Sequence, residues 1–317
     1  MRVVVALGGN ALLRREERPD AAVQLANIRA AVQALAPLAH EHELVITHGN
    51  GPQVGILALE SAADRSLSSP YPFDVLGAET QGMIGYWLLQ SLQNALPGRQ
   101  VCALVNQTLV SAADPAFADP AKFVGPVYDQ EEAERLAAER GWTVKQDGAR
   151  WRRVVPSPRP QRVVETGLIR LLLESGAVAV CAGGGGVPVI RDEEGLLSGV
   201  EAVVDKDLTA ALLAEALDAD ALLLLTDVPH VFLHYGTGDA EPVGRTTPAA
   251  LRAQNFPPGS MGPKVDAVCR FVELTGGTAA IGALHDARAL LDGTAGTVVT
   301  PTGRGLDGRS DGPEDLT

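Results

Sequence analysis

Cysteine is scarce in this sequence, which has only three among its 317 residues, and no two of them have C-x-x-C spacing. Disulfide scaffolds and zinc sites need more cysteines in closer groups, so both are disfavoured and a reducing cytosol fits. Long apolar runs are also lacking, because no stretch reaches the roughly 18 residues that span a bilayer. The apolar run after Arg2 ends at Gly8, which is too short for a signal-peptide core. We therefore expect a cytoplasmic protein that does not engage membranes.

Positive charge is also in short supply. The chain has 26 basic and 39 acidic residues, a net charge of −13 and a pI near 4.9. Nucleic-acid-binding proteins present a basic face that neutralises phosphates, so binding to nucleic acid is disfavoured. Apolar residues, by contrast, make up 46% of the chain. That is ample for the core of one large α/β domain or two modest ones.

Short runs rich in Val, Ile and Leu alternate with longer Ala/Leu-rich segments that have helical spacing. Continuous apolar strands separated by helices predict an α/β fold, in which a mainly parallel sheet is covered on both faces to give a three-layer αβα sandwich. The strands are expected at 2–7, 43–47, 101–105, 177–181, 221–226 and 278–281, and the helices at 20–40, 79–95, 161–175, 207–217 and 263–275.

One segment, residues 122–160, interrupts this alternation. It contains a short acidic helix at 131–140, followed by two alternating strands joined at Asp147-Gly148, a strong hairpin signal. A proline-rich stretch, PSPRP, ends it. We predict a protruding subdomain with a β-hairpin, inserted between two lobes. The last sixteen residues, 302–317, are glycine-rich and acidic, and they predict a disordered tail.

Three glycine-rich loops follow predicted strands: Gly8-Gly9-Asn10, Gly49-Asn50-Gly51 and the run 183–186. In open parallel sheets, ligands bind beyond the carboxyl ends of the strands. Glycine lets the backbone approach an anion closely, and the following helix start offers unpaired N–H groups. Each loop alone could be a tight turn, but three together favour phosphate binding. The Walker A pattern and the strict G-x-G-x-x-G spacing are both absent, which disfavours P-loop kinases and nicotinamide dehydrogenases.

Lysine usage carries the most information, because only four of the 26 basic residues are lysine: Lys122, Lys145, Lys206 and Lys264. Lysines retained against such a bias are enriched where a compact ammonium is required. Phosphoryl transfer is such a case, since its catalysis is mostly positioning and charge neutralisation. Lys145 lies on the polar face of the predicted hairpin and is interpreted as a solvated side chain.

The sequence D-K-D at 205–207 opens a predicted helix. Asp205 suits an N-cap and Asp207 suits the first turn, where an acid is favourable. A lysine between them opposes the helix dipole, and Lys264 does the same in the first turn of its own helix. Two lysines at positive helix ends cost stability unless they share an anion, and a nucleotide phosphate would supply one.

Several motifs together resemble the carbamate kinases of the amino acid kinase family. In order they are ALGGNALL, VITHGNGPQVG, NQTLVSAADPAF, AKFVGPVY, VVPSPRP, CAGGGGVPV, GVEAVVDKDLTAALLA, LTDV and PGSMGPKV. They cover residues 1 to about 300. Other members of the amino acid kinase fold usually carry a lysine just before the first glycine pair. Here Ala6-Leu7 stands there, and Lys122 matches the lysine that carbamate kinases supply from the protruding subdomain.

The resemblance implies the reversible reaction ATP + carbamate ⇌ ADP + carbamoyl phosphate, run mainly toward ATP in arginine-fermenting metabolism, with Mg²⁺ and a homodimer. Lys122, Lys206 and Lys264 would neutralise the transferring phosphoryl group without a covalent intermediate, while Asp207 orients the lysines and Asp205 assists. The carbamoyl phosphate end would be held by Gly8, Gly9, Asn10, Gly49, Asn50, Gly51, Gly184 and Gly185. The nucleotide site would be lined by Asp227, Val228, Tyr235, Met261, Gly262 and Lys264.

The same resemblance implies a division of the chain. Residues 1–301 would form the kinase-like domain, with 1–121 and 161–206 mainly binding the carbamate and phosphoryl groups and 207–301 mainly binding the nucleotide. Residues 122–160 would form a lid.

Some positions depart from the family pattern. Pro229 and His234 stand where an acidic or polar residue and an asparagine are expected, and Phe123 replaces a proline. These departures concern nucleotide affinity more than activity. The nearest alternative is another kinase of this fold that acts on an acyl group, a phosphonate or an isoprenoid phosphate. A non-enzymatic nucleotide sensor would need a damaged lysine cluster, and all three lysines are present.

Overall fold

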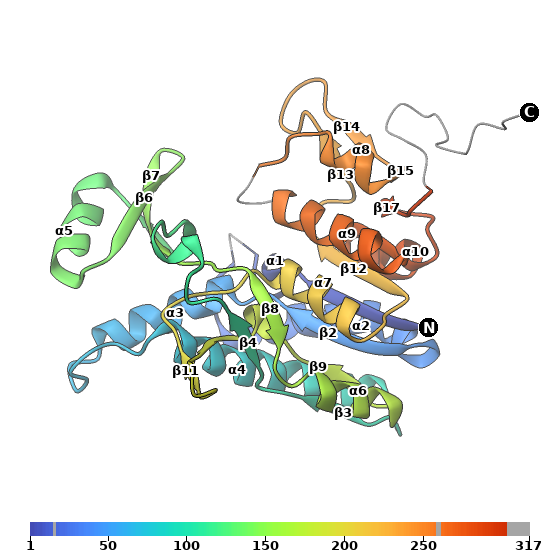
Figure 1. Cartoon of the computed structure of the whole chain (residues 1–317), viewed down its shortest axis with the longest axis horizontal. Helices are drawn as coiled ribbons and strands as arrows, with labels where there is room; N and C mark the ends of the chain where they lie inside the picture. Colours follow the sequence, from blue (N-terminus) through green and yellow to red (C-terminus); the bar gives the residue numbers. More distant parts are fainter. Residues whose placement is uncertain (15–16, 258–260, 303–317) are drawn as a thin grey trace, which may run out of the picture.

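The computed structural model describes residues 1–14, 17–257 and 261–302. An eight-stranded sheet forms its centre, with strand order β15-β17-β16-β12-β1-β2-β9-β3 (Figure 1). Every neighbouring pair is parallel except β16 and β17. The prediction of a mainly parallel sheet is confirmed. The strands are β1 (Arg2–Leu7), β2 (Glu43–His48), β3 (Val101–Ala103), β9 (Val178–Val180), β12 (Ala221–Thr226), β15 (Arg245–Thr246), β16 (Thr278–Ala283) and β17 (Thr297–Val299).

Helices cover both faces of this sheet, as predicted. Successive side chains of a strand point to opposite faces. In β1, Val3 and Val5 therefore pack into one core, and Val4 and Ala6 pack into the other. The first core includes side chains of α2 (Ala21–Glu41), α4 (Phe73–Ala95) and α10 (Ala287–Leu291). The second includes side chains of α6 (Thr166–Glu174), α7 (Lys206–Ala216), α8 (Pro248–Arg252) and α9 (Met261–Thr275).

The predicted helix at 161–175 is wrong over its first turn. That stretch begins as strand β8 (Pro160–Val163), which pairs antiparallel with β4 (Gln107–Val110). With β10 (Val187–Arg191) and β11 (Leu197–Gly199) they form a four-stranded sheet. Val163 is buried in the core by this pairing. Four further helices of the described residues were not predicted, namely α1 (Gly9–Leu12), α3 (Gly51–Ala63), α8 and α10, and α4 begins six residues before its expected start at 79.

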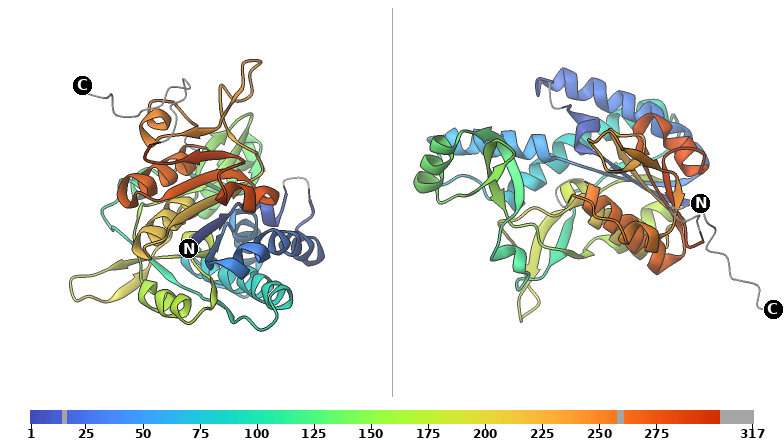
Figure 2. Two further views of the ribbon diagram at one scale, coloured as in Figure 1. Left: turned by 90° about the vertical axis from the view of Figure 1, so that its right-hand side faces the viewer. Right: turned by 90° about the horizontal axis from the view of Figure 1, so that it is seen from above.

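The inserted segment projects from the main body as a small unit (Figures 1 and 2). It contains β5 (Lys122–Tyr128), α5 (Gln130–Arg140), β6 (Thr143–Asp147) and β7 (Arg150–Val155), with strand order β5-β7-β6. The predicted hairpin is confirmed: β6 and β7 are antiparallel and Gly148 has φ of +62° in their turn. Strand β5 was not predicted. A bulge in β5 includes Gly125, whose φ of +69° suits glycine.

The remaining elements are a two-stranded sheet of β13 (Val231–Leu233) and β14 (Glu241–Val243), and three 3₁₀ turns, η1 (Pro115–Phe117), η2 (Gly183–Gly185) and η3 (Leu284–Asp286). Within the described residues, no helix is both long and apolar enough to cross a membrane. The tail predicted to be disordered lies outside the described residues, apart from Thr302.

Candidate active site

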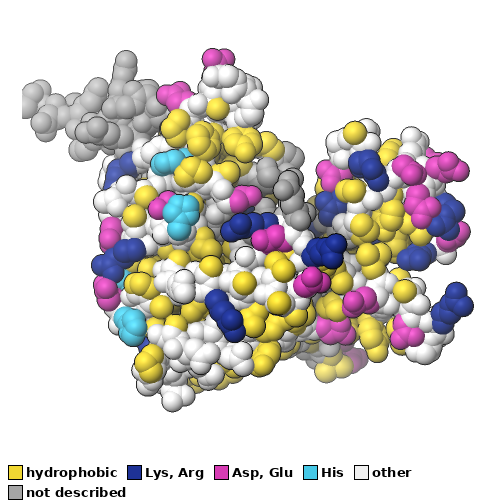
Figure 3. Space-filling view, turned by 180° about the vertical axis from the view of Figure 1, so that it is seen from behind, with side chains coloured by type: hydrophobic (Ala, Val, Ile, Leu, Met, Phe, Trp, Pro, Cys, Tyr) yellow, Lys and Arg dark blue, Asp and Glu magenta, His cyan; other side chains and the backbone are white. Residues whose placement is uncertain are grey.

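A cleft of about 690 Å³ opens beyond the carboxyl ends of β1, β2 and β12, beside the protruding unit. The space-filling view shows a notch between this unit and the main body (Figure 3). Most of the predicted site residues line the cleft although they are far apart in sequence. They are Gly8, Gly9, Gly49, Asn50, Gly51, Lys122, Gly184, Asp205, Lys206, Asp207, Asp227, Val228, Tyr235, Met261 and Lys264.

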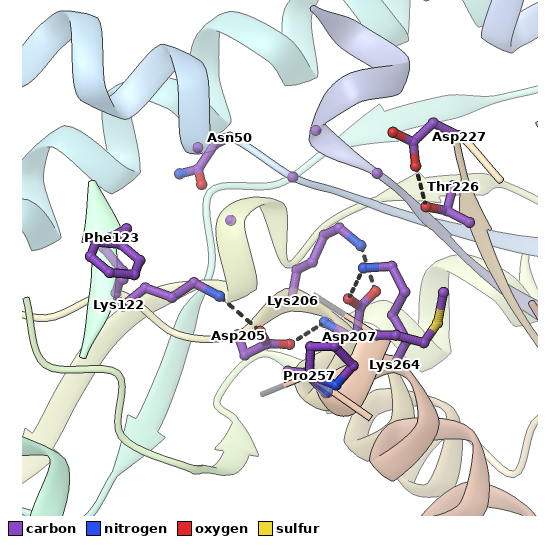
Figure 4. Close-up of a pocket in the computed structure, with 18 of the residues that line it drawn as sticks. Asn50, Lys122, Phe123, Asp205, Lys206, Asp207, Thr226, Asp227, Pro257 and Lys264 are labelled. Atoms are coloured by element: carbon purple, nitrogen blue, oxygen red, sulfur yellow. Dashed lines mark hydrogen bonds and ion pairs between the residues drawn. The ribbon is translucent and has the colours of Figure 1, made fainter. Parts of the chain in front are cut away.

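Two lysines share one carboxylate at the centre of the cleft (Figure 4). The Nζ atom of Lys206 lies 2.5 Å from Oδ1 of Asp207, and the Nζ atom of Lys264 lies 3.2 Å from Oδ2. Lys206 is the first residue of α7, and Lys264 lies in the first turn of α9. Both ammonium groups therefore stand at positive helix ends, and in this state Asp207 is the anion that they share.

The third lysine joins this cluster from the protruding unit. Lys122, the first residue of β5, places Nζ 2.9 Å from Oδ2 of Asp205. The other carboxylate oxygen, Oδ1, accepts the backbone N–H groups of Asp207 and Leu208 and caps α7. Asp205 therefore has two functions at once: it caps the helix and it holds Lys122. Lys122 is 42% exposed and Lys206 only 12%, so Lys122 remains accessible to ligand.

Burial and neighbouring charges shift the ionisation of this cluster. Burial tends to raise the pKa of Asp207, but Lys206 and Lys264 together outweigh it and hold that pKa below its ordinary value. The pKa of Lys206 lies below its ordinary 10.5, because burial and repulsion by Lys264 outweigh attraction to Asp207. An incoming anion would offset both the burial of the Lys206 ammonium and its repulsion by Lys264, because a nearby negative charge favours the charged form of each lysine.

The glycine loops meet beside Lys206. A Cβ atom at Gly49 would lie 2.8 Å from the backbone nitrogen of Gly9 and 3.4 Å from Cε of Lys206. A Cβ atom at Gly184, which has φ of +63°, would lie 2.2 Å from Nδ2 of Asn50. That amide in turn donates to Oγ1 of Thr80 at 2.8 Å. Side chains at Gly49 or Gly184 would collide with the neighbouring loop, so glycine is what lets these loops approach one another closely.

Three predicted residues differ from the rest. Gly185 does not line the cleft: its carbonyl accepts the hydroxyl groups of Thr108 and Thr209, and a Cβ atom there would meet Val204. Gly262 does not line the cleft either. Its N–H donates to the carbonyl of Pro257 at the start of α9. Asn10 lies in α1, but its side chain is outside the described part. Gly185 and Gly262 therefore contribute to local packing.

The far end of the cleft is more apolar. Val228 and Met261 line it with the predicted Tyr235, whose side chain is largely exposed. Asp227, beside Thr226, supplies a carboxylate there. Sequence reasoning missed several lining residues: Pro263, which lies within the motif PGSMGPKV, and four that have no motif of their own, His230, Phe232, Phe256 and Pro257. The ring of His230 meets that of Phe232 edge-on, with centroids 6.3 Å apart.

One further functional candidate was missed in the glycine motif HGNG. His48 is buried, and its Nδ1–H donates to the carbonyl of Gly49 at 3.0 Å. Burial lowers the pKa of His48 to about 4, and Lys206 acts in the same direction. The imidazole therefore stays neutral and supports the glycine loop rather than binding an anion.

The chemistry of the cleft is that of an anion site divided between two ligands. Lysine ammonium groups and the first turns of helices surround the middle of the cleft. The glycine loops line one end, and apolar side chains line the other. Among the described residues, no group of three or more His, Cys, Asp or Glu side chains could hold a metal ion. A polyphosphate with an aromatic base, facing a small acceptor, fits this distribution of charge and polarity.

Comparisons with known proteins point the same way. The model of the amino acid kinase family matches residues 1–282. A carbamate kinase of Rhizobium meliloti is 52% identical over 95% of this chain and 93% of its own length, and one of Haemophilus influenzae is 50% identical over 96% and 99%. A carbamate kinase of Giardia lamblia solved with AMP-PNP superposes with a TM-score of 0.87 at 38% identity, covering 95% of this chain and 98% of its own.

An isopentenyl phosphate kinase of T. acidophilum, covering 94% of this chain and all of its own, has a TM-score of 0.51 at 16% identity. That likeness extends to the fold alone.

Proposed function

This chain belongs to the amino acid kinase family, and within it to the carbamate kinases, and we infer that it transfers a phosphoryl group reversibly between ATP and carbamate. The observation that supports this most strongly is the convergence of Lys122, Lys206 and Lys264 in one cleft around two carboxylates. Three ammonium groups suit a transferring phosphoryl group, whose negative charge is spread over its oxygens.

We propose that the lysines act by charge neutralisation and that no covalent intermediate forms. Lys206 and Lys264 release part of their attraction to Asp207 when phosphate oxygens enter, and Asp207 keeps both ammonium groups aimed at the same point. Asp205 holds Lys122 at the edge of the site. Because Lys206 and Lys264 are already held beside Asp207, little reorganisation of these two groups accompanies transfer.

We propose that the two ends of the cleft bind different substrates. The glycine loops at Gly8-Gly9 and Gly49–Gly51 hold carbamate or carbamoyl phosphate through backbone N–H groups. Asp227, Val228, Tyr235 and Met261 hold the nucleotide. Mg²⁺ usually takes only one or two protein carboxylates and would come bound to the nucleotide phosphates, where it would neutralise their charge. Asp227 lines this end of the cleft and would supply a carboxylate to it.

We further propose that residues 122–160 act as a lid, and that 1–121 with 161–206 mainly bind the phosphoryl end while 207–301 mainly bind the nucleotide. Carbamate is small and offers few contacts, so its transfer depends on exclusion of water. Lys122 lies at the first residue of the protruding unit, so closure of the unit would carry this cation over the site.

A cytoplasmic homodimer acting in arginine metabolism, mainly toward ATP, completes the proposal. Cys102, Cys181 and Cys269 are all free thiols, which suits a reducing compartment. Leu168 and Leu171 of α6 are exposed and offer an apolar patch that a second copy would cover. Sedimentation equilibrium would test the dimer.

A substrate panel tests the proposed reaction against the other kinases of this fold. The protein is incubated with Mg²⁺ and ATP together with carbamate (from bicarbonate and ammonia), acetylglutamate, uridylate or isopentenyl phosphate, and ADP formation is measured. We expect turnover with carbamate and, in reverse, ATP from carbamoyl phosphate and ADP. Turnover with one of the other acceptors and none with carbamate would replace the proposal.

A further inference from the structure

The protruding unit contacts the main body through a segment that leads directly to the lysine cluster. This linking segment, residues 200–205, ends at Asp205, the N-cap of α7. Its alternate residues Ala202 and Val204 are buried in the main body. The intervening residues 201, 203 and 205 contact the protruding unit or Pro156, which directly follows it, so one short segment connects the unit to the site.

Three polar contacts of the linking segment lie on this side. The guanidinium of Arg153 donates from Nη2 to Oε1 of Glu201 at 3.1 Å. The N–H of Val203 donates to the carbonyl of Pro156 at 3.0 Å. Lys122 contacts Asp205 at 2.9 Å. The contact that positions Lys122 is therefore one of three that follow one another along the same short segment.

Arg153 makes the most specific of these contacts. Its guanidinium lies between two aromatic rings, with Cζ 4.8 Å from the ring centroid of Phe73 and 4.7 Å from that of Trp142. Phe73 is the first residue of α4 in the main body, whereas Trp142 belongs to the protruding unit. The Arg153 side chain is only 20% exposed. A planar cation between two rings is held in position and orientation more firmly than a surface ion pair.

Glu201 completes the arrangement from the other side. Its Oε2 atom accepts the backbone N–H of Phe73 at 2.8 Å while Oε1 accepts from Arg153. One carboxylate therefore joins the start of α4, the linking segment and β7 of the protruding unit. Without Arg153, the side-chain ion pair left between the unit and the linking segment would be that of Lys122 with Asp205, in which the lysine is 42% exposed and the aspartate 13%. A partly exposed lysine in a single ion pair is held less firmly than a stacked, mostly buried arginine.

We propose that Arg153 is a positioning residue that acts through Glu201 and the linking segment to hold Lys122 at the phosphoryl site. This inference rests on the proposed function and deepens it. The mechanism requires no contact between Arg153 and substrate. It predicts a loss in turnover rather than in nucleotide binding, since the nucleotide residues lie at the opposite end of the cleft.

The test begins with Arg153→Ala and its matched control Arg135→Ala, which removes an arginine of α5 that pairs with Glu132 and Glu139 of the same helix. ATP formation from carbamoyl phosphate and ADP is measured together with ADP binding by calorimetry. We expect kcat of Arg153→Ala to fall at least about tenfold, because small displacements of a catalytic group are costly. The Kd for ADP should change less than about twofold, and Arg153→Lys should be intermediate.

A double variant separates positioning from general destabilisation. If Arg153 acts through Lys122, adding Arg153→Ala to Lys122→Ala should lower kcat by less than about twofold more. Two full effects that multiply, or an Arg153→Ala enzyme with normal kcat, would overturn the inference. Glu201→Gln repeats the test from outside the protruding unit if Arg153→Ala does not fold. An inactive wild-type protein would instead contradict the proposed function.

Discussion

At the residue scale, Lys206 occupies a position that requires a compact cation. Its ammonium lies 2.5 Å from Asp207, and its chain passes within 3.4 Å of where a side chain at Gly49 would begin. A guanidinium is broader and planar, so it cannot take the same place without displacing the glycine loop. In a chain where arginine outnumbers lysine, the presence of lysine at this position therefore has a physical reason.

Replacement of Lys206 by arginine therefore tests geometry with the charge kept. We expect Lys206→Arg to lose at least about tenfold in turnover, since the new cation is misplaced relative to the phosphoryl group. Steady-state ATP formation measures it. Lys145→Arg is the control, because Lys145 is an exposed residue of the protruding unit that pairs with Asp119, outside the lysine cluster. Retention of most activity in Lys206→Arg would contradict this account.

The depressed pKa of Lys206 predicts an alkaline limb in the activity. Lys206 acts as the protonated ammonium, so activity is lost as pH rises through its pKa, which lies below 10.5. Bound phosphates favour the ammonium and move this pKa upward. We expect the alkaline limb of kcat to lie at higher pH than that of kcat/KM. Coincident limbs near 10.5 would show that burial does not affect this lysine.

His48 predicts a separate pH effect on stability. Its pKa falls from 6.5 in the unfolded chain to about 4 in the folded one, so the unfolded state binds the proton more tightly between these values. The contribution of His48 to the free energy of unfolding is fully present above pH 6.5 and declines by roughly 3 kcal/mol as the pH falls to 4. Denaturant unfolding at several pH values measures it. His48→Gln should lose less stability over this range, and an equal loss would refute the assignment.

At the element scale, the sequence predicted the elements with the clearest patterns. The apolar strands of the central sheet and the hairpin at Asp147-Gly148 follow from local composition. Helix α3 was missed because Gly51 and Pro52 read as a turn, although proline is tolerated in the first helical turn, where no N–H partner is needed. Strand β8 was missed because its pairing with β4 joins residues about fifty positions apart, which no local pattern reveals.

The protruding unit is joined to the body by packing as well as by charge. Val124 and Val155 pack with Val54, Phe73 and Leu76 in a small apolar core at its base. Removal of the whole unit would expose that core, so a single substitution tests its function more cleanly.

Lys122→Ala is that substitution. The side chain is 42% exposed, and its truncation leaves the apolar core intact, so folding should be preserved. We expect turnover to fall by about a hundredfold, because one preorganised cation is lost. ADP binding, measured by calorimetry, should stay within about twofold of the wild type. Near-normal turnover would remove the protruding unit from the mechanism.

At the scale of the whole molecule, one continuous sheet carries both ends of the cleft. Strand β1, which leads to the first glycine loop, pairs directly with β12, which leads to Asp227. The two ends of the cleft therefore lie at neighbouring strands, with the lysine cluster beside them. The resemblance named the three lysines and implied that Asp207 orients them. The distances from Asp207 to Lys206 and Lys264 depend on the packing of α7 against α9, which no local pattern reveals.

The aromatic and proline residues at the nucleotide end could not be predicted for the same reason. Phe232 lies in β13 and Phe256 in the segment before α9, and only the folded chain brings both to the cleft. Their types are ordinary core types, so the sequence gives no sign that they line a cleft.

The most direct test is ATP formation from carbamoyl phosphate and Mg²⁺-ADP by the wild-type protein and by Lys206→Ala, Lys264→Ala and Lys145→Ala. We predict that the wild type and Lys145→Ala are equally active. Lys206→Ala and Lys264→Ala should each lose at least about a hundredfold in turnover while remaining folded, because each removes a cation worth a few kcal/mol in the transition state. Near-normal turnover in either cluster variant would contradict the account.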